Sequence, residues 1–518
     1  MRTKIKQQLT GLVKWVKNHQ YLSIVIVVAI FGTVLLLAAN ATTGFVSKEA
    51  EDGTPNGTAK IISDNSAASN SAIQFGGSNQ FVHPGILVTK PQLEFVKSKV
   101  NANQEPWKSA YAKLSSDPKV RKETNYWKAK PVSVLKCSTG IARSYGWVAE
   151  GCYNTGSADE SNLNWESASA YGRALVWAVT GDQWYADKSI EIMNAWSYTL
   201  EEIPYDQPRI TCDNNCAGKG QPVYWQNLLE VGWSADTMIR AAEIIKHTNA
   251  GWEQADIDQF ESMLRNLYYP LIKNYAYGSF GNGGATWAEG ILNIGIFLDD
   301  RQIYDEGLAY VRSAARSMTY VSRDGTNPIY PYNPLTTALD PAITTPTQLA
   351  GIWSGQTHHG RGPMTGPYIQ GQNIETCRDL HHTFMGLGGI ANGMETAWIQ
   401  GDDLYGDPDL KDRMLSGLEL NSNYVNQRID EMARTGQTAK QVSDSSWKPS
   451  GQWVCTNYVD DDGSSRQGKE LALNHYKNRL GLGSQLSQTI RLTESERNRK
   501  QGAGNHLLWE TLTHAENP

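Results

Sequence analysis

The sequence predicts an all-α domain built from repeated helical hairpins, preceded by an N-terminal region of a different kind. Apolar residues recur at three- and four-residue spacing in the segments 165–179, 182–200, 225–247, 256–274 and 304–318. A second observation is a joint that recurs between an apolar helix and an amphipathic one, at Gly181-Asp182, Asp299-Asp300 and Gly401-Asp402. Glycine ends a helix in the left-handed conformation, and aspartate caps the next helix. Such units stack either as a closed α/α toroid or as an open solenoid, and composition does not separate the two.

The N-terminal region predicts membrane insertion. Residues 1–20 contain five basic side chains and no acidic one, and residues 21–39 contain no charged side chain. We therefore expect 1–20 to be a cytoplasmic basic leader and 21–39 to be a transmembrane signal anchor, with the rest of the chain outside the cell. Cleavage after Ala41 would instead release a secreted protein.

Residues 40–81 are rich in Ser, Asn, Gly and Thr, which is typical of a linker. Within them, 46–54 and 69–75 are similar to the leading strands of a β-sandwich carbohydrate-binding module. The segment is too short for a whole sandwich, so a linker with a short hairpin, or a truncated remnant of such a module, is expected. The helical domain then occupies residues 82–518.

Net charge and cysteine content indicate which partners, disulfides and metal sites to expect. The formal net charge is −6, and the basic leader makes the remainder more acidic still, which argues against a nucleic-acid partner. Any polyanion must be captured by local Arg and Lys side chains. Six cysteines in an exported domain permit disulfides, and Cys137 with Cys152 and Cys212 with Cys216 would leave Cys377 with Cys455, although 15 pairings are possible. Because there is no Cys-x-x-Cys pair with a nearby histidine, no metal and no cofactor are expected.

The segment 375–383 carries the densest set of chemically active side chains. If a helix begins here, Glu375, Arg378 and His382 fall near one face, at spacings of three and four. An acid–base centre for an anionic substrate needs a cation, an imidazole and an orienting carboxylate. The alternative interpretation is a helix cap followed by a surface salt bridge.

Two further segments add candidates. Asn282 stands in a Gly-rich turn before an apolar run, where its amide can donate to a carboxylate or simply cap the helix, and the ring of Trp287 can stack on a sugar. The segment 474–479 contains His475, Tyr476 and Arg479 and follows Arg466. It is either part of an active site or a solvated helix face.

From about residue 83 to its end, the chain resembles the alginate-lyase-like polysaccharide lyases with a helical toroid fold, closest to polysaccharide lyase family 38. The matching segments are 83–93, 174–185, 282–301, 375–383 with 400–405, and 474–476. The sequence departs from the family pattern at Leu380, at Gly283-Gly284 and at Leu473. The resemblance favours the toroid and implies β-elimination on a 4-linked polyuronate, glucuronan or an alginate-like polymer.

The resemblance and the chemistry together suggest roles. Asn282, with Arg378 or a protonated Glu375, would neutralise the uronate carboxylate. Tyr476 would be the proton donor and a candidate base, and His382 the second proton-transfer group or the activator of Tyr476. Substrate-binding roles fall to Arg466, His475, Arg479 and Trp287. This mechanism requires His382 and Tyr476 to approach each other within one sugar ring.

Two alternatives come from other classes of protein. An inverting glycoside hydrolase on a similar toroid would need two carboxylates about 6.5–9.5 Å apart, for which residues 460–462 and Glu375 are the obvious sources. A non-catalytic surface glycan-binding protein is the other. Only a lyase forms products with a conjugated double bond, which absorb in the ultraviolet.

Overall fold

The computed structural model describes residues 81–123, 128–135, 163–203, 225–276, 281–340, 343–459, 468–497 and 507–518, and the backbone of four short strands. The chain divides into two compact units, residues 1–79 and 80–518. In the first unit, β1 (Ala59–Ser63) pairs antiparallel with β2 (Ser71–Phe75) as a hairpin. The predicted membrane segment 21–39 lies outside the described residues. Among the helices that are described, none combines the length and apolar character needed to cross a bilayer.

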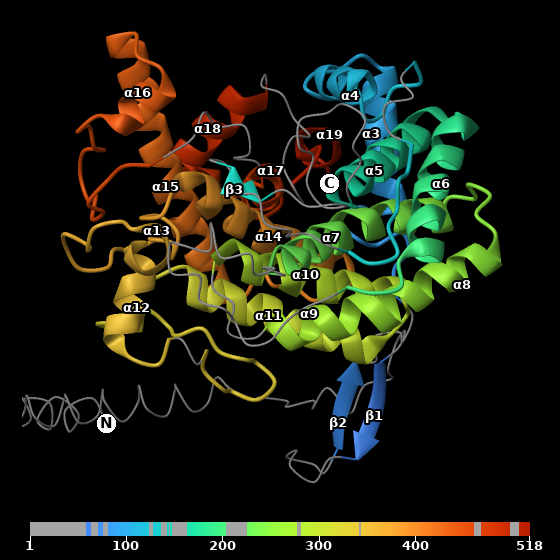
Figure 1. Cartoon of the computed structure of the whole chain (residues 1–518), viewed down its shortest axis with the longest axis horizontal. Coiled ribbons are helices and arrows are strands. Elements are labelled where there is room, and N and C mark those ends of the chain that lie inside the picture. The colour runs from blue at the N-terminus through green and yellow to red at the C-terminus, as the bar shows by residue number, and fades with distance from the viewer. Residues whose placement is uncertain are drawn as a thin grey trace, which may run out of the picture. The chain divides into compact units, whose positions relative to one another are not determined.

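Where the structure describes it, the second unit is helical, as predicted, apart from the two-residue strands β3 (Ala142–Arg143) and β4 (Gly146–Trp147) (Figure 1). Its longer helices are α3 (Lys90–Asn101), α4 (Trp107–Ser116), α5 (Leu163–Thr180), α6 (Gln183–Thr199), α7 (Trp225–His247), α8 (Gln254–Met263), α9 (Tyr269–Ala276), α10 (Gly281–Phe297), α11 (Arg301–Met318), α14 (Leu380–Ile399), α15 (Pro408–Thr435) and α18 (Ser487–Arg497). The shorter ones are α12 (Pro346–Trp353), α13 (Gln356–His359), α16 (Ala439–Asp444), α17 (Glu470–Leu473) and α19 (Glu510–His514), with π-helical turns at Leu264–Tyr268 and Asn474–Arg479.

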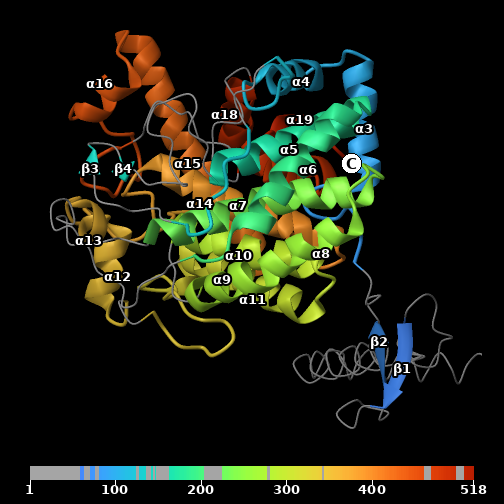
Figure 2. The same ribbon diagram turned by 45° about the vertical axis from the view of Figure 1, so that its right-hand side comes forward.

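The helices pack around a closed circle. α5 packs on α7, α7 on α10, α10 on α14, α14 on α17, and α17 on α19, which returns through α3 to α5. Outside this circle, α6, α11 and α15 each form a hairpin with the inner helix that precedes them (Figures 1 and 2). A circle of contacts that closes on itself favours the toroid over the open solenoid.

The inner helices α7, α10 and α14 run in parallel, so their N-terminal ends share one face of the unit. Near that face, Trp287 of α10 donates to the carbonyl of Leu228 on α7. Deeper in the ring, the fully buried Arg240 of α7 pairs with Glu289 of α10, which also accepts from Asn392 of α14 at 3.0 Å. A buried charge pair of this kind is tolerated because each ion is hydrogen-bonded to the other. Side chains at the starts of α10 and α14 are therefore brought together.

The predicted joints between helices hold at two of three places. Asp182 caps α6 by accepting from the amide of Trp184 at 3.2 Å, and Asp300 caps α11 through Ile303 at 3.3 Å. The third prediction is wrong, because α15 begins at Pro408 with Asp407 as its cap. Asp402 instead accepts a hydrogen bond from the Tyr304 hydroxyl at 2.7 Å and so ties α11 to the end of α14.

A disulfide fixes the segment that precedes α14. Cys377 is bonded to Cys455, across 78 residues of chain, and the other four cysteines lie outside the described residues. The amide of Leu380 also donates to the carbonyl of Val459 at 3.1 Å. The loop that follows α16 is thereby held against the segment 375–383, which contains the predicted catalytic residues.

Candidate active site

The site is built from the first turns of α10 and α14. Asn282 lies in the first turn of α10, and Glu375 and Arg378 lie in the turns just before α14. Gly281 has a φ of 74°, and a Cβ at this position would come within 2.6 Å of the Glu375 carboxyl carbon. Only glycine therefore allows the carboxylate of Glu375 to approach the start of α10 this closely.

Glu375 holds Asn282 and Arg378 side by side. One carboxylate oxygen accepts from the Asn282 backbone amide at 2.7 Å, and both oxygens accept from the Asn282 side-chain amide at 3.1 Å. Arg378 Nη1 donates to the same carboxylate at 2.7 Å. Glu375 is only 6% exposed. These contacts show that an amide from α10 and a guanidinium from the turn before α14 can share one carboxylate at this place.

Arg378 also determines the tautomer of His382. Arg378 Nη2 lies 2.8 Å from His382 Nε2, and a guanidinium can only donate. Nε2 must therefore be the accepting nitrogen, and the proton of the neutral ring sits on Nδ1. Nδ1 donates to Asp379, whose two oxygens lie 2.7 and 2.9 Å away.

Asp379 is the cap of α14 and also orients the imidazole. Its Oδ1 accepts from the backbone amide of His382 at 2.8 Å. Burial acts to raise the pKa of Asp379, but the hydrogen bonds from His382 and the charge of Arg378 outweigh burial and hold that pKa well below its usual value. Asp379 is therefore an ionised carboxylate that keeps the proton of His382 on Nδ1.

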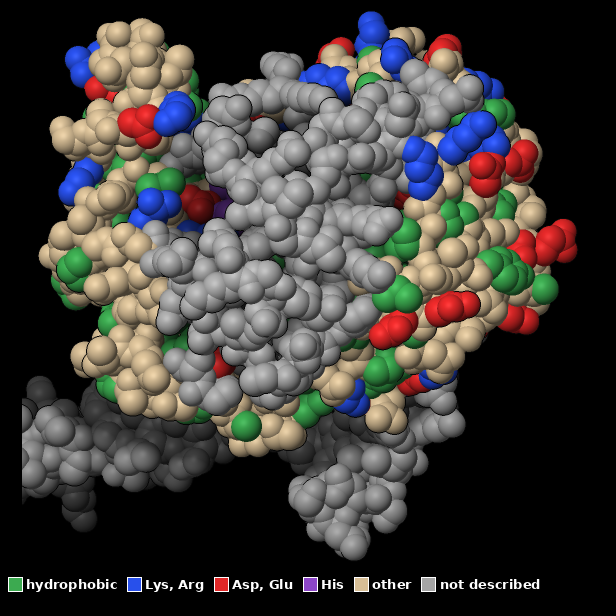
Figure 3. Space-filling model, viewed as in Figure 1, with side chains coloured by type: hydrophobic (Ala, Val, Ile, Leu, Met, Phe, Trp, Pro, Cys, Tyr) green, Lys and Arg blue, Asp and Glu red, His purple; other side chains and the backbone are tan. Residues whose placement is uncertain are grey.

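The arrangement has the properties of an acid–base centre for an anion. Asn282, Glu375, Arg378, His382 and Asp379 form one continuous hydrogen-bonded chain. The side chains of Arg378 and His382 are 24% and 28% exposed, so both reach solvent. Figure 3 shows histidine, acidic and basic side chains close together on the face that it draws. A cation and an unprotonated imidazole nitrogen thus lie side by side, and the nitrogen is engaged by Arg378 in this arrangement.

The C-terminal candidates lie elsewhere. Tyr476 is fully buried and its ring packs edge-on against Tyr405, with centroids 5.2 Å apart. His475 is 2% exposed and stacks on Tyr405 at 3.8 Å. Arg479 donates to Glu395 at 2.8 Å and lies over the ring of Trp398. These side chains belong to the core at the far end of α14.

The expected approach of Tyr476 to His382 is therefore wrong. The residues around Tyr476 contact α14 near its C-terminal end: Arg479 binds Glu395, and His475 packs on Trp398. Glu395 and Trp398 lie thirteen and sixteen positions after His382, which corresponds to about 20 Å along the helix axis. Burial also raises the pKa of the Tyr476 hydroxyl far above its usual value. The run 474–479 forms a π-helical turn in which Asn474, His475 and Tyr476 are buried, so these side chains serve packing rather than catalysis.

The two other substrate-binding candidates are Trp287 and Arg466. Trp287 is 2% exposed and donates its Nε1 proton to the backbone of α7, so it holds α10 to α7 and offers no sugar platform. Arg466 lies outside the described residues. The roles given to Asn282, Glu375, Arg378 and His382 remain predictions, but these four side chains do meet.

Two participants had no role assigned from the sequence. Asp379 has a recognisable signal, because an aspartate three residues before a histidine at a helix start can cap the helix and bind the ring. Arg361 has none, because it lies in the loop after α13. Its Nε donates to the carbonyl of Arg378 at 3.3 Å and supports the turn that aims the guanidinium.

Replacing Tyr476 with Phe is expected to leave activity within about twofold of the wild type. The hydroxyl is buried and makes no hydrogen bond, so its removal costs little and can even raise the melting temperature. Steady-state rates and thermal melts of the two proteins check this. A loss of 10²-fold or more in a folded variant would return Tyr476 to the mechanism.

Comparison with known proteins gives a family match and several similar structures. Residues 102–329 match the family model described as alginate lyase, a range that includes Asn282. Among solved structures, this chain is similar to alginate lyase A1-III from Sphingomonas species A1, at 12% identity over 79% of this chain and 92% of that one, with a TM-score of 0.43. An alginate lyase from Bacteroides ovatus is similar at 12% identity over 83% and 99%, with a TM-score of 0.44. No curated protein matches. The family match confirms the predicted resemblance to alginate lyases.

Proposed function

We propose that this chain, an alginate-lyase-like polysaccharide lyase by its family match at residues 102–329, cleaves a 4-linked polyuronate by β-elimination. The substrate would be an alginate-like polymer or glucuronan. The observation that carries the proposal is the hydrogen-bonded chain from Asn282 through Glu375 and Arg378 to His382. It combines anion-binding donors with an unprotonated imidazole nitrogen.

Neutralisation of the substrate carboxylate is the first requirement of the reaction. The C5 proton of a uronate is weakly acidic while the neighbouring carboxylate keeps its charge. Asn282 and Arg378 already donate together to the carboxylate of Glu375. Nη1 and Nη2 of Arg378 each carry a second proton, which can be donated to the substrate carboxylate. Donors aimed at the developing charge contribute about 3–4 kcal/mol each in comparable sites.

Proton transfer falls to His382. Its Nε2 lone pair becomes free once the Arg378 guanidinium turns from the ring to the substrate carboxylate. Nε2 then takes the C5 proton, the electrons form the C4–C5 double bond, and the bond from C4 to the glycosidic oxygen breaks. The imidazolium then returns its proton to the departing oxygen. One group can do both when the proton and the oxygen leave from the same side of the ring, which is the arrangement in D-mannuronate and D-glucuronate. We therefore propose syn elimination on such a residue, without Tyr476.

The glycoside hydrolase alternative finds less support. Its acid would need a raised pKa, whereas the pKa of Asp379 is lowered, against the effect of burial, by its contacts with His382 and Arg378. Glu375 is bound by Arg378 and Asn282. Residues 460–462 lie outside the described residues. A non-catalytic glycan-binding protein would not require His382 to be held with its proton on Nδ1.

The test is a substrate screen that follows the absorbance of the unsaturated product. Purified protein is incubated with polymannuronate, polyguluronate, glucuronan, hyaluronan and pectate. We expect ultraviolet absorbance to rise with polymannuronate or glucuronan and to stay flat with polyguluronate, in which the two groups leave from opposite sides. New reducing ends without absorbance would indicate a hydrolase, and binding without either product a glycan-binding protein.

We also propose that the helical unit works outside the cell. The support is the uncharged segment 21–39 behind a basic leader and the disulfide between Cys377 and Cys455, which needs an oxidising compartment. An extracellular position matches a polymeric substrate that does not cross membranes.

A further inference from the structure

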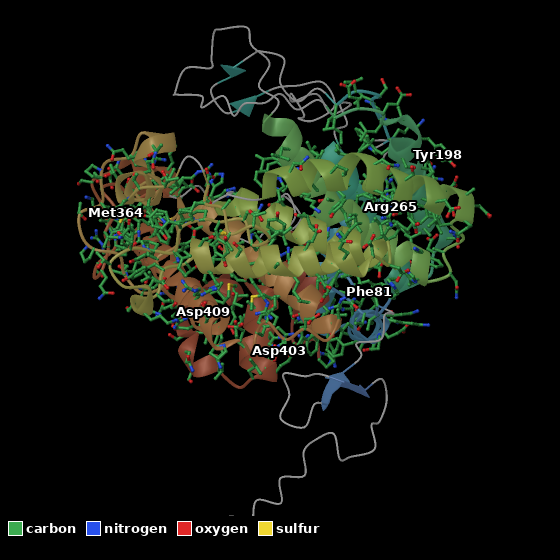
Figure 4. The ribbon with its side chains drawn as sticks, turned by 90° about the horizontal axis from the view of Figure 1, so that it is seen from below. Phe81, Tyr198, Arg265, Met364, Asp403 and Asp409 are labelled. Carbon is green, nitrogen blue, oxygen red and sulfur yellow. A yellow bond between two sulfur atoms is a disulfide. The ribbon has the colours of Figure 1, made fainter. Side chains whose placement is uncertain are left out.

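A second polar cluster lies at the opposite end of the inner helices. Glu243 and His247 stand one turn apart in the last turns of α7, and His83 lies in the segment that enters the helical unit. One ligand atom of each of these three side chains lies within 4.8 Å of the other two. Asp299, in the turn after α10, is the fourth member of the cluster. Figure 4 shows Phe81, close to His83 in sequence, at the border of the helical unit.

Two atoms of the cluster are left without hydrogen bonds. Glu243 Oε1 accepts from His83 Nδ1 at 2.6 Å and from the Gly85 amide at 3.0 Å. Glu243 Oε2 has no hydrogen-bond partner, although the side chain is fully buried, and neither has His247 Nε2. The two atoms face each other 3.7 Å apart, too far for a hydrogen bond. A buried carboxylate oxygen without a donor is costly, so a missing positive partner is indicated.

We propose that His83, Glu243 and His247 bind a divalent transition-metal ion of the zinc type. Zinc binds imidazole nitrogen and carboxylate oxygen at about 2.0–2.2 Å, so an ion between Glu243 Oε2 and His247 Nε2 fits their 3.7 Å separation. Two imidazoles with one carboxylate favour zinc over calcium or magnesium, which take oxygen ligands. A water molecule would complete a four-coordinate site.

His83 changes partner on binding. Its ring stacks on that of His247, with centroids 4.2 Å apart and planes 10° apart, and two parallel rings cannot both point at one ion. His83 must therefore turn out of the stack and give up its contact with Glu243. Asp299 lies 3.1 Å from His83 Nε2 and can hold that nitrogen's proton, which leaves Nδ1 free for the metal. A carboxylate behind a liganding histidine is a common support in zinc sites.

The site would stabilise the fold and take no part in elimination. α10 has 17 residues, so Asp299 beyond its end lies about 25 Å along the axis from Asn282. The ion would tie the entering segment to α7, beside the hydrogen bonds that Gln400 makes with Val82 and Gly85. The sequence does not reveal the set, because His83 and Glu243 lie 160 positions apart.

The test uses the full-length protein stripped with a chelator and dialysed against ZnCl₂. We expect about one equivalent of retained zinc by elemental analysis, and a melting temperature that rises with zinc concentration. Glu243→Gln and His247→Gln should each abolish both effects, whereas His381→Gln, a histidine change in another part of the unit, should retain them.

Cobalt provides a readout that does not depend on the folding of variants. The Co²⁺-loaded wild type should show the visible absorption of a four-coordinate nitrogen and oxygen site, and added zinc should displace it. Zinc retention that the Glu243 and His247 variants leave unchanged would overturn the proposal. So would a melting temperature that responds to pH in the histidine range but not to metal, since the cluster would then be a proton-dependent contact only.

Discussion

His382→Asn is expected to lower kcat by at least about 10²-fold, with a small change in KM. The expectation rests on His382 Nε2, which accepts from Arg378 at 2.8 Å and therefore carries no proton in the resting protein. Asparagine keeps a polar side chain on the first turn of α14 but supplies no base. The loss should appear in kcat because proton transfer occurs in the transition state.

The adjacent histidine provides the matched control for this experiment. His381 lies on the same turn, and its ring centroid is 4.9 Å from that of His382, whereas the hydrogen bonds to Arg378 and Asp379 described above are made by His382. His381→Asn should keep kcat within about fivefold. If the two variants lost activity equally while both stayed folded, the base would not be His382 and the mechanism would need another proton acceptor.

Sequence reasoning succeeded where the required contacts are local. Glu375, Arg378 and His382 do meet, as expected. However, α14 begins only at Leu380, after the extended cap Asp379, so a turn before the helix brings them together and not one helical face. Asn282 could be added because it stands in a Gly-rich turn before an apolar run, and Glu375 approaches this turn at Gly281. The hairpin architecture followed in the same way from periodicity and from the aspartate caps at Asp182 and Asp300.

Sequence reasoning failed where the orientation of a polar segment decides its role. The run from His475 to Arg479 contains the residue types of an active site, but its partners are Tyr405 and Glu395, which no spacing rule connects to it. Nothing local distinguishes a π-helical turn that faces a core from a helix that faces a cleft. The cluster around His83 was missed because its members come from segments far apart in the chain, so no local pattern marks it.

Asp379→Asn is expected to lower kcat by about 10²–10⁴-fold while the helix start is kept. Asparagine caps helices as well as aspartate does, so the hydrogen bond from the His382 amide can be retained. The amide group can, however, present a donor to His382 Nδ1, which would move the ring proton to Nε2. That nitrogen would then face the donors of Arg378 and could no longer accept the C5 proton. A loss of this size is known when the orienting aspartate of a catalytic histidine becomes asparagine.

Stability measurements separate this tautomer effect from a general loss of structure. The pKa of Asp379 is lowered in the folded protein, so its ionised form contributes stability that is present above the unfolded pKa of about 3.9 and is lost as the pH falls through the folded value. The Asn variant should therefore melt below the wild type at neutral pH, and the gap should narrow as the pH falls below about 4.

Asp300→Asn is the matched control for the same change at another helix. Asp300 caps α11 and binds Arg265 at 3.0 Å, so Asp300→Asn removes the same kind of cap charge and ion pair as Asp379→Asn. Asp300 has no histidine partner in the described structure. We expect a lowered melting temperature and a normal kcat. An Asp379→Asn protein that kept the wild-type kcat would show that the orientation of His382 does not depend on this carboxylate, and the assignment of Nε2 as the base would lose its main support.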